Sequence, residues 1–263
     1  MISLVIATQL DHLCVVLVNT RNPLNIGAAA RAMSNFGFRD LRLVHPFEPS
    51  FREARSAVGA SSSEVLAEAR EYSSVAEAVA DCNLVIGTTA AARRELQHPL
   101  CSLGEAETTN LIRRKLGRGR VALLFGSEKR GLSNEDFSYC HWLLRIPTRE
   151  KHGSMNLGQA VAVCLYEIAR TAKVPTRTGK GKPAAFVAAK LEKGSPATAA
   201  EAERITTLLL EALRASGYLA AKPSSPADEK VRRMIRRLDL SSSDAQVWLG
   251  MLRQIVWKIN KIG

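Results

Sequence analysis

The sequence of 263 residues predicts an α/β fold with a mostly parallel sheet covered on both faces, followed by a small all-helical extension. Two observations predict this fold. Short uninterrupted apolar runs, typical of strands buried on both faces, alternate with segments of helical periodicity through residue 171. Beyond residue 196 the periodicity is helical throughout. With 46% apolar and 24% charged residues, the chain can bury a full core and a smaller second domain.

Five apolar runs predict the strands, at Leu13–Val18, 41–44, Leu84–Thr88, Val121–Phe125 and 142–146. The Ala-rich segment 27–36 predicts a helix that ends at Gly37. Ser102 and Glu105 have the spacing of a capping box, which predicts a helix from there to Leu116. After the fifth strand, apolar residues at positions 161, 164, 165 and 168 predict one more helix.

Residues 172–183 are rich in Lys, Thr, Gly and Pro, a composition typical of a linker. We therefore expect a domain over 1–171, a linker over 172–195 and an extension over 196–263. In the extension, Thr198 and Glu201 predict the start of a helix that Gly217 stops. The last helix, 244–262, is expected to start at a Ser243 cap and to bury Trp248, Leu252, Ile255 and Ile259.

The middle helix of the extension, residues 228–238, predicts an arginine-rich surface. Val231, Ile235 and Leu238 form an apolar stripe, and four arginines occupy the other side: Arg232, Arg233, Arg236 and Arg237. The net charge of +12 is concentrated in the whole tail, because residues 1–171 carry 20 basic and 17 acidic side chains and residues 172–263 carry 17 and 8. Such an excess attracts nucleic acid, although a solvated basic face is an alternative.

The cysteines and histidines argue against a disulfide framework and a metal site. The five cysteines have no CxxC spacing, and the five histidines form no HxxxH or HExxH pair. The N-terminal apolar segment has no basic leader. We therefore expect a cytoplasmic protein with free thiols, no metal and no membrane association.

Three turn-forming blocks, at 22–31, 126–132 and 146–156, each follow an apolar run. Because ligands of open α/β sheets bind at the carboxyl ends of strands, these blocks predict one shared pocket. The second block nearly matches a phosphate-binding P-loop, but Leu132 occupies the position of the required lysine. No GxGxxG follows a strand, and no GxSxG is present. A pocket rich in Gly, Asn and Ser, with Arg31 as its main fixed charge, suits the orientation of a reactive cofactor.

The residues of these blocks resemble a known family. Asn25-Ile-Gly-Ala-Ala-Ala-Arg31, Phe125-Gly-Ser-Glu-Lys-Arg-Gly-Leu132, and Ile146-Pro147 followed by Ser154-Met-Asn156 are similar to the three motifs of SPOUT-class RNA 2′-O-methyltransferases of the TrmH type. The resemblance covers residues ~13–171. The tail looks like that of the TrmJ branch, which methylates the ribose of nucleotide 32 in the tRNA anticodon loop.

This resemblance implies a SPOUT fold with a C-terminal trefoil knot, a homodimer whose active site spans the subunit interface, and S-adenosylmethionine as the methyl donor. It also implies which residues line the cofactor pocket, chiefly through backbone groups: Thr88, Thr89, Ala90, Gly126, Ile146, Gly153, Ser154 and Met155. The implied catalytic neighbourhood consists of Asn25, Arg31, Glu128, Ser154 and Asn156. The implied RNA substrate is tRNA, bound with help from the basic extension.

Other interpretations of these residues and of the chain stay open at this point. Asn25 is also a suitable cap for a helix beginning at Ile26, and Ser154 for the helix that follows it. Trp257 can stack on bases, but its helical register favours core packing. For the whole protein, ribosomal RNA is an alternative substrate, and a non-catalytic RNA-binding protein with the same fold is an alternative function.

Overall fold

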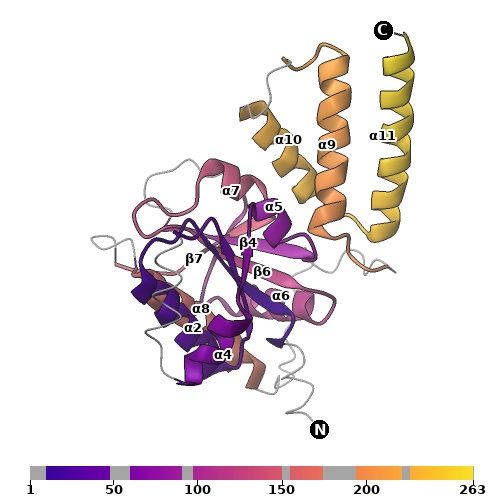
Figure 1. Ribbon diagram of the computed structural model, residues 1–263. Coiled ribbons are helices and arrows are strands. Elements are labelled where there is room, and N and C mark those ends of the chain that lie inside the picture. Colours follow the sequence, from indigo (N-terminus) through magenta and orange to yellow (C-terminus); the bar gives the residue numbers. More distant parts are fainter. Residues whose placement is uncertain are drawn as a thin grey trace, which may run out of the picture.

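The computed structural model of the protein describes residues 10–47, 60–90, 97–149, 155–173, 194–220 and 226–262 (Figure 1). Within these ranges, seven strands form one sheet in the order β3-β2-β1-β6-β4-β7-β5, and neighbouring strands are parallel. The strands are β1 (Leu13–Val18), β2 (Asp40–Val44), β3 (Arg70–Tyr72), β4 (Leu84–Thr88), β5 (Leu100–Ser102), β6 (Val121–Phe125) and β7 (Trp142–Arg145). The predicted parallel α/β sheet is confirmed.

Helices cover both faces of this sheet. One face packs on α2 (Pro23–Phe36), α4 (Ala60–Glu68), α6 (Ala106–Leu116) and α8 (Leu157–Lys173), and the other on α5 (Val75–Ala78) and α7 (Asn134–Ser138). Side chains of β1 alternate between the two cores, with Val15 and Leu17 in one and Cys14 and Val16 in the other. Burial on both faces explains why the central strands are uninterrupted apolar runs.

The edge strands and the short helices escaped prediction. β3 and β5 are three residues long and partly exposed, so they carry no apolar run. The predicted capping box of Ser102 and Glu105 is wrong, because Ser102 lies in β5 and Glu105 caps α6 without a side-chain hydrogen bond. Capping boxes form instead before α7, with Ser133 and Asp136, and before α9, with Thr198 and Glu201 as predicted.

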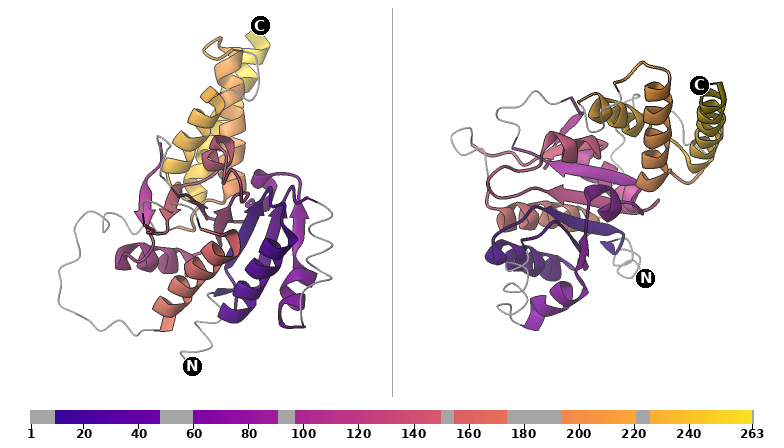
Figure 2. Two further views of the ribbon diagram at one scale, coloured as in Figure 1. Left: turned by 90° about the vertical axis from the view of Figure 1, so that its left-hand side faces the viewer. Right: turned by 45° about the horizontal axis from the view of Figure 1, so that its top comes forward.

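The extension is a layer of three helices, α9 (Ala199–Ala215), α10 (Pro226–Arg237) and α11 (Ser242–Ile262). Figures 1 and 2 show α9 between the other two, with α10 beside α7 and α11 farthest from the sheet. The expected Ser243 cap is wrong, since the Ser241 hydroxyl accepts the Asp244 N–H at 3.1 Å. Ile255 is 47% exposed rather than buried, because α11 packs on α9 through another stripe: Ala245, Leu249, Leu252 and Val256.

The predicted arginine surface of α10 is also wrong for most of its members. Arg236 is buried and bonds to Glu203, while Arg232 and Arg233 are half-buried and paired with acidic side chains. Only Arg237 of the four is exposed. The sequence period separated these arginines from the apolar stripe, but the side of the helix that carries them faces the rest of the protein.

The amino-terminal edge of the sheet anchors the extension. Buried Arg42 pairs with Asp40 and Asp81, and the carbonyl groups of Ala80 and Cys82 accept the N–H groups of Ala200 and Ala199 at 3.0 and 2.7 Å.

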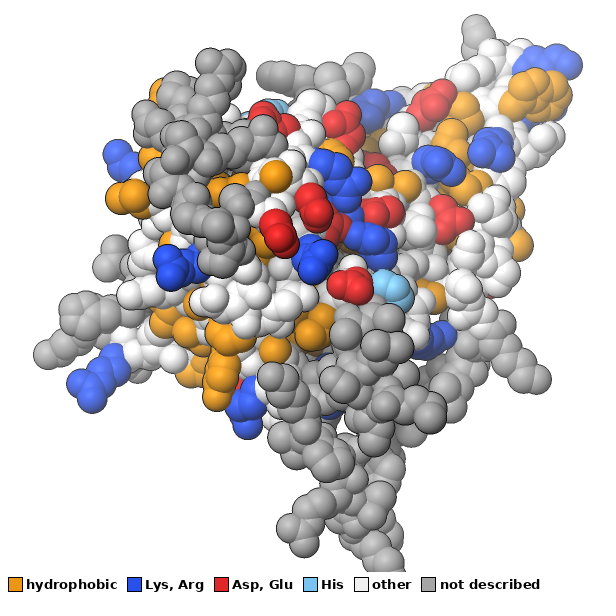
Figure 3. Space-filling model, turned by 60° about the horizontal axis from the view of Figure 1, so that its bottom comes forward, with side chains coloured by type: hydrophobic (Ala, Val, Ile, Leu, Met, Phe, Trp, Pro, Cys, Tyr) orange, Lys and Arg blue, Asp and Glu red, His pale blue; other side chains and the backbone are white. Residues whose placement is uncertain are grey.

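Where coloured side chains are visible in Figure 3, acidic and basic groups are interspersed on the face shown. Both signs of charge thus occur on this face.

Two expectations concern residues that are partly outside the described ranges. Residues 174–193, most of the proposed linker, are among them, and so are residues 150–154 on the chain path that would form the knot. The linker and the knot therefore stay predictions. Of the helices within the described ranges, none has both the length and the hydropathy needed to cross a bilayer.

Candidate functional site

The three blocks meet at the carboxyl edge of the sheet. In the strand order, β1, β6, β4 and β7 are successive neighbours, and the blocks at 22–31, 126–132 and 146–156 follow β1, β6 and β7. The predicted cofactor segment 88–90 follows β4, between them. Parallel strands thus bring together loops that lie up to 134 residues apart in the sequence, from 22 to 156.

A chain of side-chain hydrogen bonds joins these blocks. The amide nitrogen of Asn156 donates to Oδ1 of Asn25 at 2.8 Å, and the amide nitrogen of Asn25 donates to Oε1 of Glu128 at 2.9 Å. Asn25 is only 6% exposed, so the Asn25 side of both hydrogen bonds is shielded from solvent. Oδ1 of Asn156 also accepts the N–H of Gln159 at 3.3 Å, in the first turn of α8. One residue from each block therefore takes part in a single network.

The Glu128 carboxylate is fixed from the side of α2. Its oxygens accept the backbone N–H groups of Asn22 at 3.2 Å and Arg21 at 3.4 Å, besides the Asn25 amide. Burial by itself raises the pKa of Glu128, but these hydrogen bonds outweigh burial and hold the pKa below its usual value. The group is therefore a stable anion at neutral pH and a weak base.

The local sequence around Asn22 explains how Asn25 becomes available. Asn22 caps α2, its side chain accepts the N–H of Leu24 at 2.9 Å, and Pro23 occupies the first helical turn. The alternative that Asn25 is the cap is wrong, because the helix starts at Pro23, four residues earlier than the Ala-rich segment 27–36 indicated. Asn22 followed by Pro23 was the signal for this start, and it places Asn25 in the first turn of the helix.

The predicted cofactor residues lie along the same edge, as far as they are described. The hydroxyl of Thr88 donates to the Leu124 carbonyl at 2.8 Å, and the N–H of Thr89 donates to the Leu144 carbonyl at 3.0 Å. Ala90 is exposed, and Ile146 and Met155 are half-buried. Gly153 and Ser154 lie outside the described residues.

Gly126 is required by a close approach of the backbone. A Cβ atom on this residue would lie 2.0 Å from the carbonyl carbon of Gly131, because the loop folds back on itself. The N–H of Gly131 donates to the Ser127 carbonyl at 2.8 Å, and Gly131 has a φ of 67°. This tight loop presents Glu128 toward α2.

Arg31 stands apart from the hydrogen-bonded network. It lies on α2 six residues beyond Asn25 and is exposed. Within the described part of the chain it has no ion pair or hydrogen bond, so its guanidinium is available to a ligand. An unpaired arginine can bind a phosphate with two parallel hydrogen bonds.

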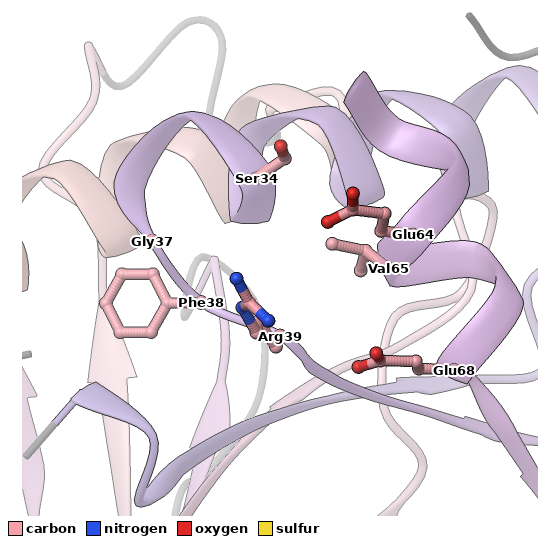
Figure 4. Close-up of a pocket in the computed structure, with 7 residues that line it drawn as sticks. All are labelled: Ser34, Gly37, Phe38, Arg39, Glu64, Val65 and Glu68. Atoms are coloured by element: carbon pink, nitrogen blue, oxygen red, sulfur yellow. The ribbon is translucent and has the colours of Figure 1, made fainter. Parts of the chain in front are cut away.

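Two cavities border α2 without containing the network. An apolar groove of about 430 Å³ reaches Ile146 and is lined by Phe36, Leu103, Gly104, Ile146, Pro147, Ala162, Val163, Tyr166 and Glu167. A smaller pocket of about 90 Å³ lies between the end of α2 and α4, where Arg39, Glu64 and Glu68 surround it (Figure 4). None of the predicted site residues lines this smaller pocket, so it is not part of the candidate site.

Comparisons with known proteins agree with this geometry. The model of the SpoU rRNA methylase family matches residues 12–166. A Pseudomonas aeruginosa protein named tRNA (cytidine/uridine/adenosine-2′-O-)-methyltransferase TrmJ is 35% identical over 255 residues, covering 94% of each chain. The TrmJ protein of Sodalis glossinidius is 30% identical over 94% of this chain and 92% of its own length. The crystal structure of TrmJ from Z. mobilis ZM4 matches with a TM-score of 0.73 at 30% identity, over 92% of this chain and 98% of that one.

The family match spans the sheet and all three motif blocks, and the relatives extend through the helical extension as well. The chain therefore belongs to the SpoU rRNA methylase family, and it is a methyltransferase that takes its methyl group from S-adenosylmethionine.

Proposed function

We propose that this enzyme methylates the 2′-hydroxyl of a ribose in tRNA, at nucleotide 32 of the anticodon loop. The observation that carries the proposal is the hydrogen-bonded chain of Asn156, Asn25 and Glu128, which joins the three motif blocks at one edge of the sheet. Relatives named for 2′-O-methylation of tRNA align with the chain over its extension as well as its catalytic domain. Position 32 rests on the resemblance of that extension to the TrmJ branch. The free thiols suit a cytoplasmic enzyme.

The residues at the carboxyl edge fit S-adenosylmethionine. The ends of β4, β6 and β7 are adjacent, so the backbone groups of Ala90, Gly126 and Ile146 line one stretch of this edge. Half-buried Ile146 and Met155 provide apolar surface for an adenine ring. Gly153 and Ser154 complete the cofactor residues in this proposal. The cofactor supplies an already activated methyl group, so the protein needs to bind and orient rather than to activate.

In this proposal the chain positions the ribose oxygen and stabilises its charge. The bound cofactor would supply the methyl group to the 2′-oxygen and would leave as a neutral thioether, and the 2′-hydroxyl proton would pass to solvent, because Glu128 is a weak base. Holding the 2′-oxygen and the methyl carbon ~3–3.5 Å apart and in line is the main way in which the protein would accelerate the reaction. Arg31 binds the neighbouring phosphate and stabilises the growing negative charge on oxygen, since a guanidinium with a pKa above ~12 is a poor base. Asn156 and Ser154 orient the ribose or the cofactor carboxylate.

We further propose a homodimer in which α2 and α8 meet their copies. These helices expose apolar side chains in and beside the 430 Å³ groove, with Tyr166 51% and Val163 38% exposed. Tyr166 packs edge-on against Phe36 of α2, with ring centroids 5.8 Å apart, so the two helices form one continuous apolar surface. A second subunit would cover this surface and would complete a site shared between subunits.

The part of the extension that fits RNA is the outer side of α11. Arg253, Trp257 and Lys261 recur every four residues and share one side of the helix, with Lys258 beside them. Trp257 is 54% exposed, which makes the expectation of core packing wrong, and Nζ of Lys261 lies 5.0 Å from its ring. An exposed aromatic ring among cations can stack on a base while the cations contact phosphates.

The central test is mapping of methylated nucleosides by mass spectrometry after incubation of the protein with tRNA, rRNA and labelled S-adenosylmethionine. We expect one 2′-O-methylated ribose in tRNA, at position 32. Label in rRNA alone would contradict the substrate. Binding of tRNA with no transfer to any RNA would favour the non-catalytic RNA-binding protein, and label at another tRNA position would contradict only the proposed nucleotide.

Replacement of Arg31 by Lys tests the role of its planar fork. We expect Arg31→Lys to lower kcat about 10- to 100-fold, because an ammonium cannot form the two parallel bonds to a phosphate. Single-turnover kinetics at saturating tRNA and cofactor measure this change. Arg39→Lys, at an exposed arginine three residues beyond the end of α2, is the control and should retain full turnover. Equal turnover of Arg31→Lys and the wild type would exclude a need for the guanidinium.

Charge placed on the apolar surface of α8 tests the homodimer. Tyr166→Glu should convert a dimer of about twice 28.6 kDa into a monomer, because burial of the new carboxylate against a second subunit is costly. Sedimentation equilibrium measures the mass. Tyr218→Glu, at a tyrosine that is 78% exposed in the extension, is the matched control. If both variants and the wild type have the same mass, α8 is not the dimer surface.

Two substitutions on α11 separate charge from stacking in tRNA binding. Lys258→Ala should reduce the slope of log K against log salt concentration by about 1, and Trp257→Ala should weaken binding about 5- to 150-fold without changing that slope. Filter binding at several salt concentrations measures both. Lys230→Ala removes the same charge from α10 and should change neither quantity. An effect of Lys230→Ala as large as that of Lys258→Ala would argue against a specific α11 surface.

A further inference from the structure

Helix α10 contacts the segment that follows the Glu128 loop. Nη1 of Arg232 donates to the hydroxyl of Ser138 at 3.1 Å, and the guanidinium carbon of Arg232 lies 4.4 Å from the ring centroid of Tyr139. Ser138 is the last residue of α7, and Tyr139 caps that helix. Only Ser133 separates α7 from the loop 126–132, and Leu132 at the end of this loop is buried. Arg232 therefore contacts α7, the helix that follows the Glu128 loop.

The same side of α10 reaches the segment that follows β4. Nη2 of Arg233 donates to Oε1 of Gln97 at 2.6 Å, seven residues beyond Ala90. The next residue, His98, lies beside Phe137 of α7, with ring centroids 6.3 Å apart. Burial, and then the charge of Arg233, lower the pKa of His98 to about 4, so the ring is neutral at pH 7 and packs against Phe137 without a charge.

Glu203 of α9 holds the arginine side chains in place. Its oxygens accept Nε of Arg232 at 3.0 and 3.1 Å, and Oε2 accepts Nη2 of Arg236 at 3.2 Å. The Arg236 side chain is fully buried, so a carboxylate beside it offsets the cost of its desolvation. Two helices of the extension thus cooperate to present one rigid guanidinium to α7.

We propose that Arg232 and Arg233 are positioning residues for the cofactor site: through Ser138 and Tyr139 they hold the segment that leaves β6, and through Gln97 they hold the segment that enters β5, the neighbour of β7. This inference rests on the proposed cofactor residues Gly126 and Ile146, which follow β6 and β7. It assigns to α10 a function in S-adenosylmethionine binding that needs no RNA, whereas α11 carries the RNA contacts. We call these contacts of Arg232 and Arg233 the α10 clamp. Its loss would let the two segments move by a fraction of an ångström or more, which weakens a preorganised site.

The test measures cofactor affinity of the full-length protein by isothermal titration calorimetry with S-adenosylmethionine, in the absence of RNA. Arg232→Ala should raise Kd on the order of tenfold. Arg232→Lys should restore less than half of the lost affinity, because an ammonium cannot bond to Ser138 and Glu203 while stacked on Tyr139. Arg204→Ala, at an exposed arginine of α9, is the matched control and should leave Kd unchanged.

A double-mutant cycle and a second variant separate positioning from stability. If Arg232 acts through Ser138, the effects of Arg232→Ala and Ser138→Ala on Kd should be less than additive. Gln97→Ala removes the exposed partner of Arg233, and it should raise Kd even if Arg232→Ala fails to fold. Variants that lower Tm but bind with the wild-type Kd would overturn the clamp and leave the proposed function intact. Absence of binding by the wild type would overturn the cofactor site and the clamp together.

Discussion

The site depends on the amide of Asn25, which joins three parts of the chain at once. Its oxygen accepts from Asn156 at the start of α8, and its nitrogen donates to Glu128 in the loop after β6. A buried amide with both ends bonded has one orientation, and either neighbour would lose a partner if the loops separated. The network therefore sets the spacing between the amino ends of α2 and α8 and the Glu128 loop. That spacing fixes the geometry of the candidate site.

The structure divides the basic residues of the extension between two tasks. On α10, burial makes an unpaired guanidinium costly, so Arg232 and Arg236 are held by Glu203 and are not available to phosphates. On α11 the cations lie in solvent, where they carry no cost of desolvation and are available to a polyanion. Net charge counts both groups alike, and only burial distinguishes an arginine that is paired inside the protein from a cation that is available to a ligand.

Sequence reasoning succeeded where one physical requirement determined the local pattern. The central strands are buried on both faces, so they are largely apolar, and five strands were recognisable even though β2 carries Asp40 and Arg42. The Thr198 and Glu201 box forms because both groups satisfy backbone donors of the same helix end. Sequence reasoning failed at β5, where pairing with β7 decides the conformation of Ser102. It also failed at α11, where packing on α9 decides which stripe of the helix is buried. In both cases a neighbour far along the chain made the choice.

By itself, the sequence determined the class of fold, the three motif blocks and the resemblance to RNA methyltransferases, because these reside in short runs whose residue types suffice. It named Asn25, Glu128 and Asn156, but it did not contain their hydrogen bonds, which exist only once parallel strands bring 25, 128 and 156 together. Tertiary structure alone decided that the arginines of α10 face the protein and that Trp257 faces solvent. The physical reason is that helical period fixes which residues share a side, whereas packing fixes where that side points.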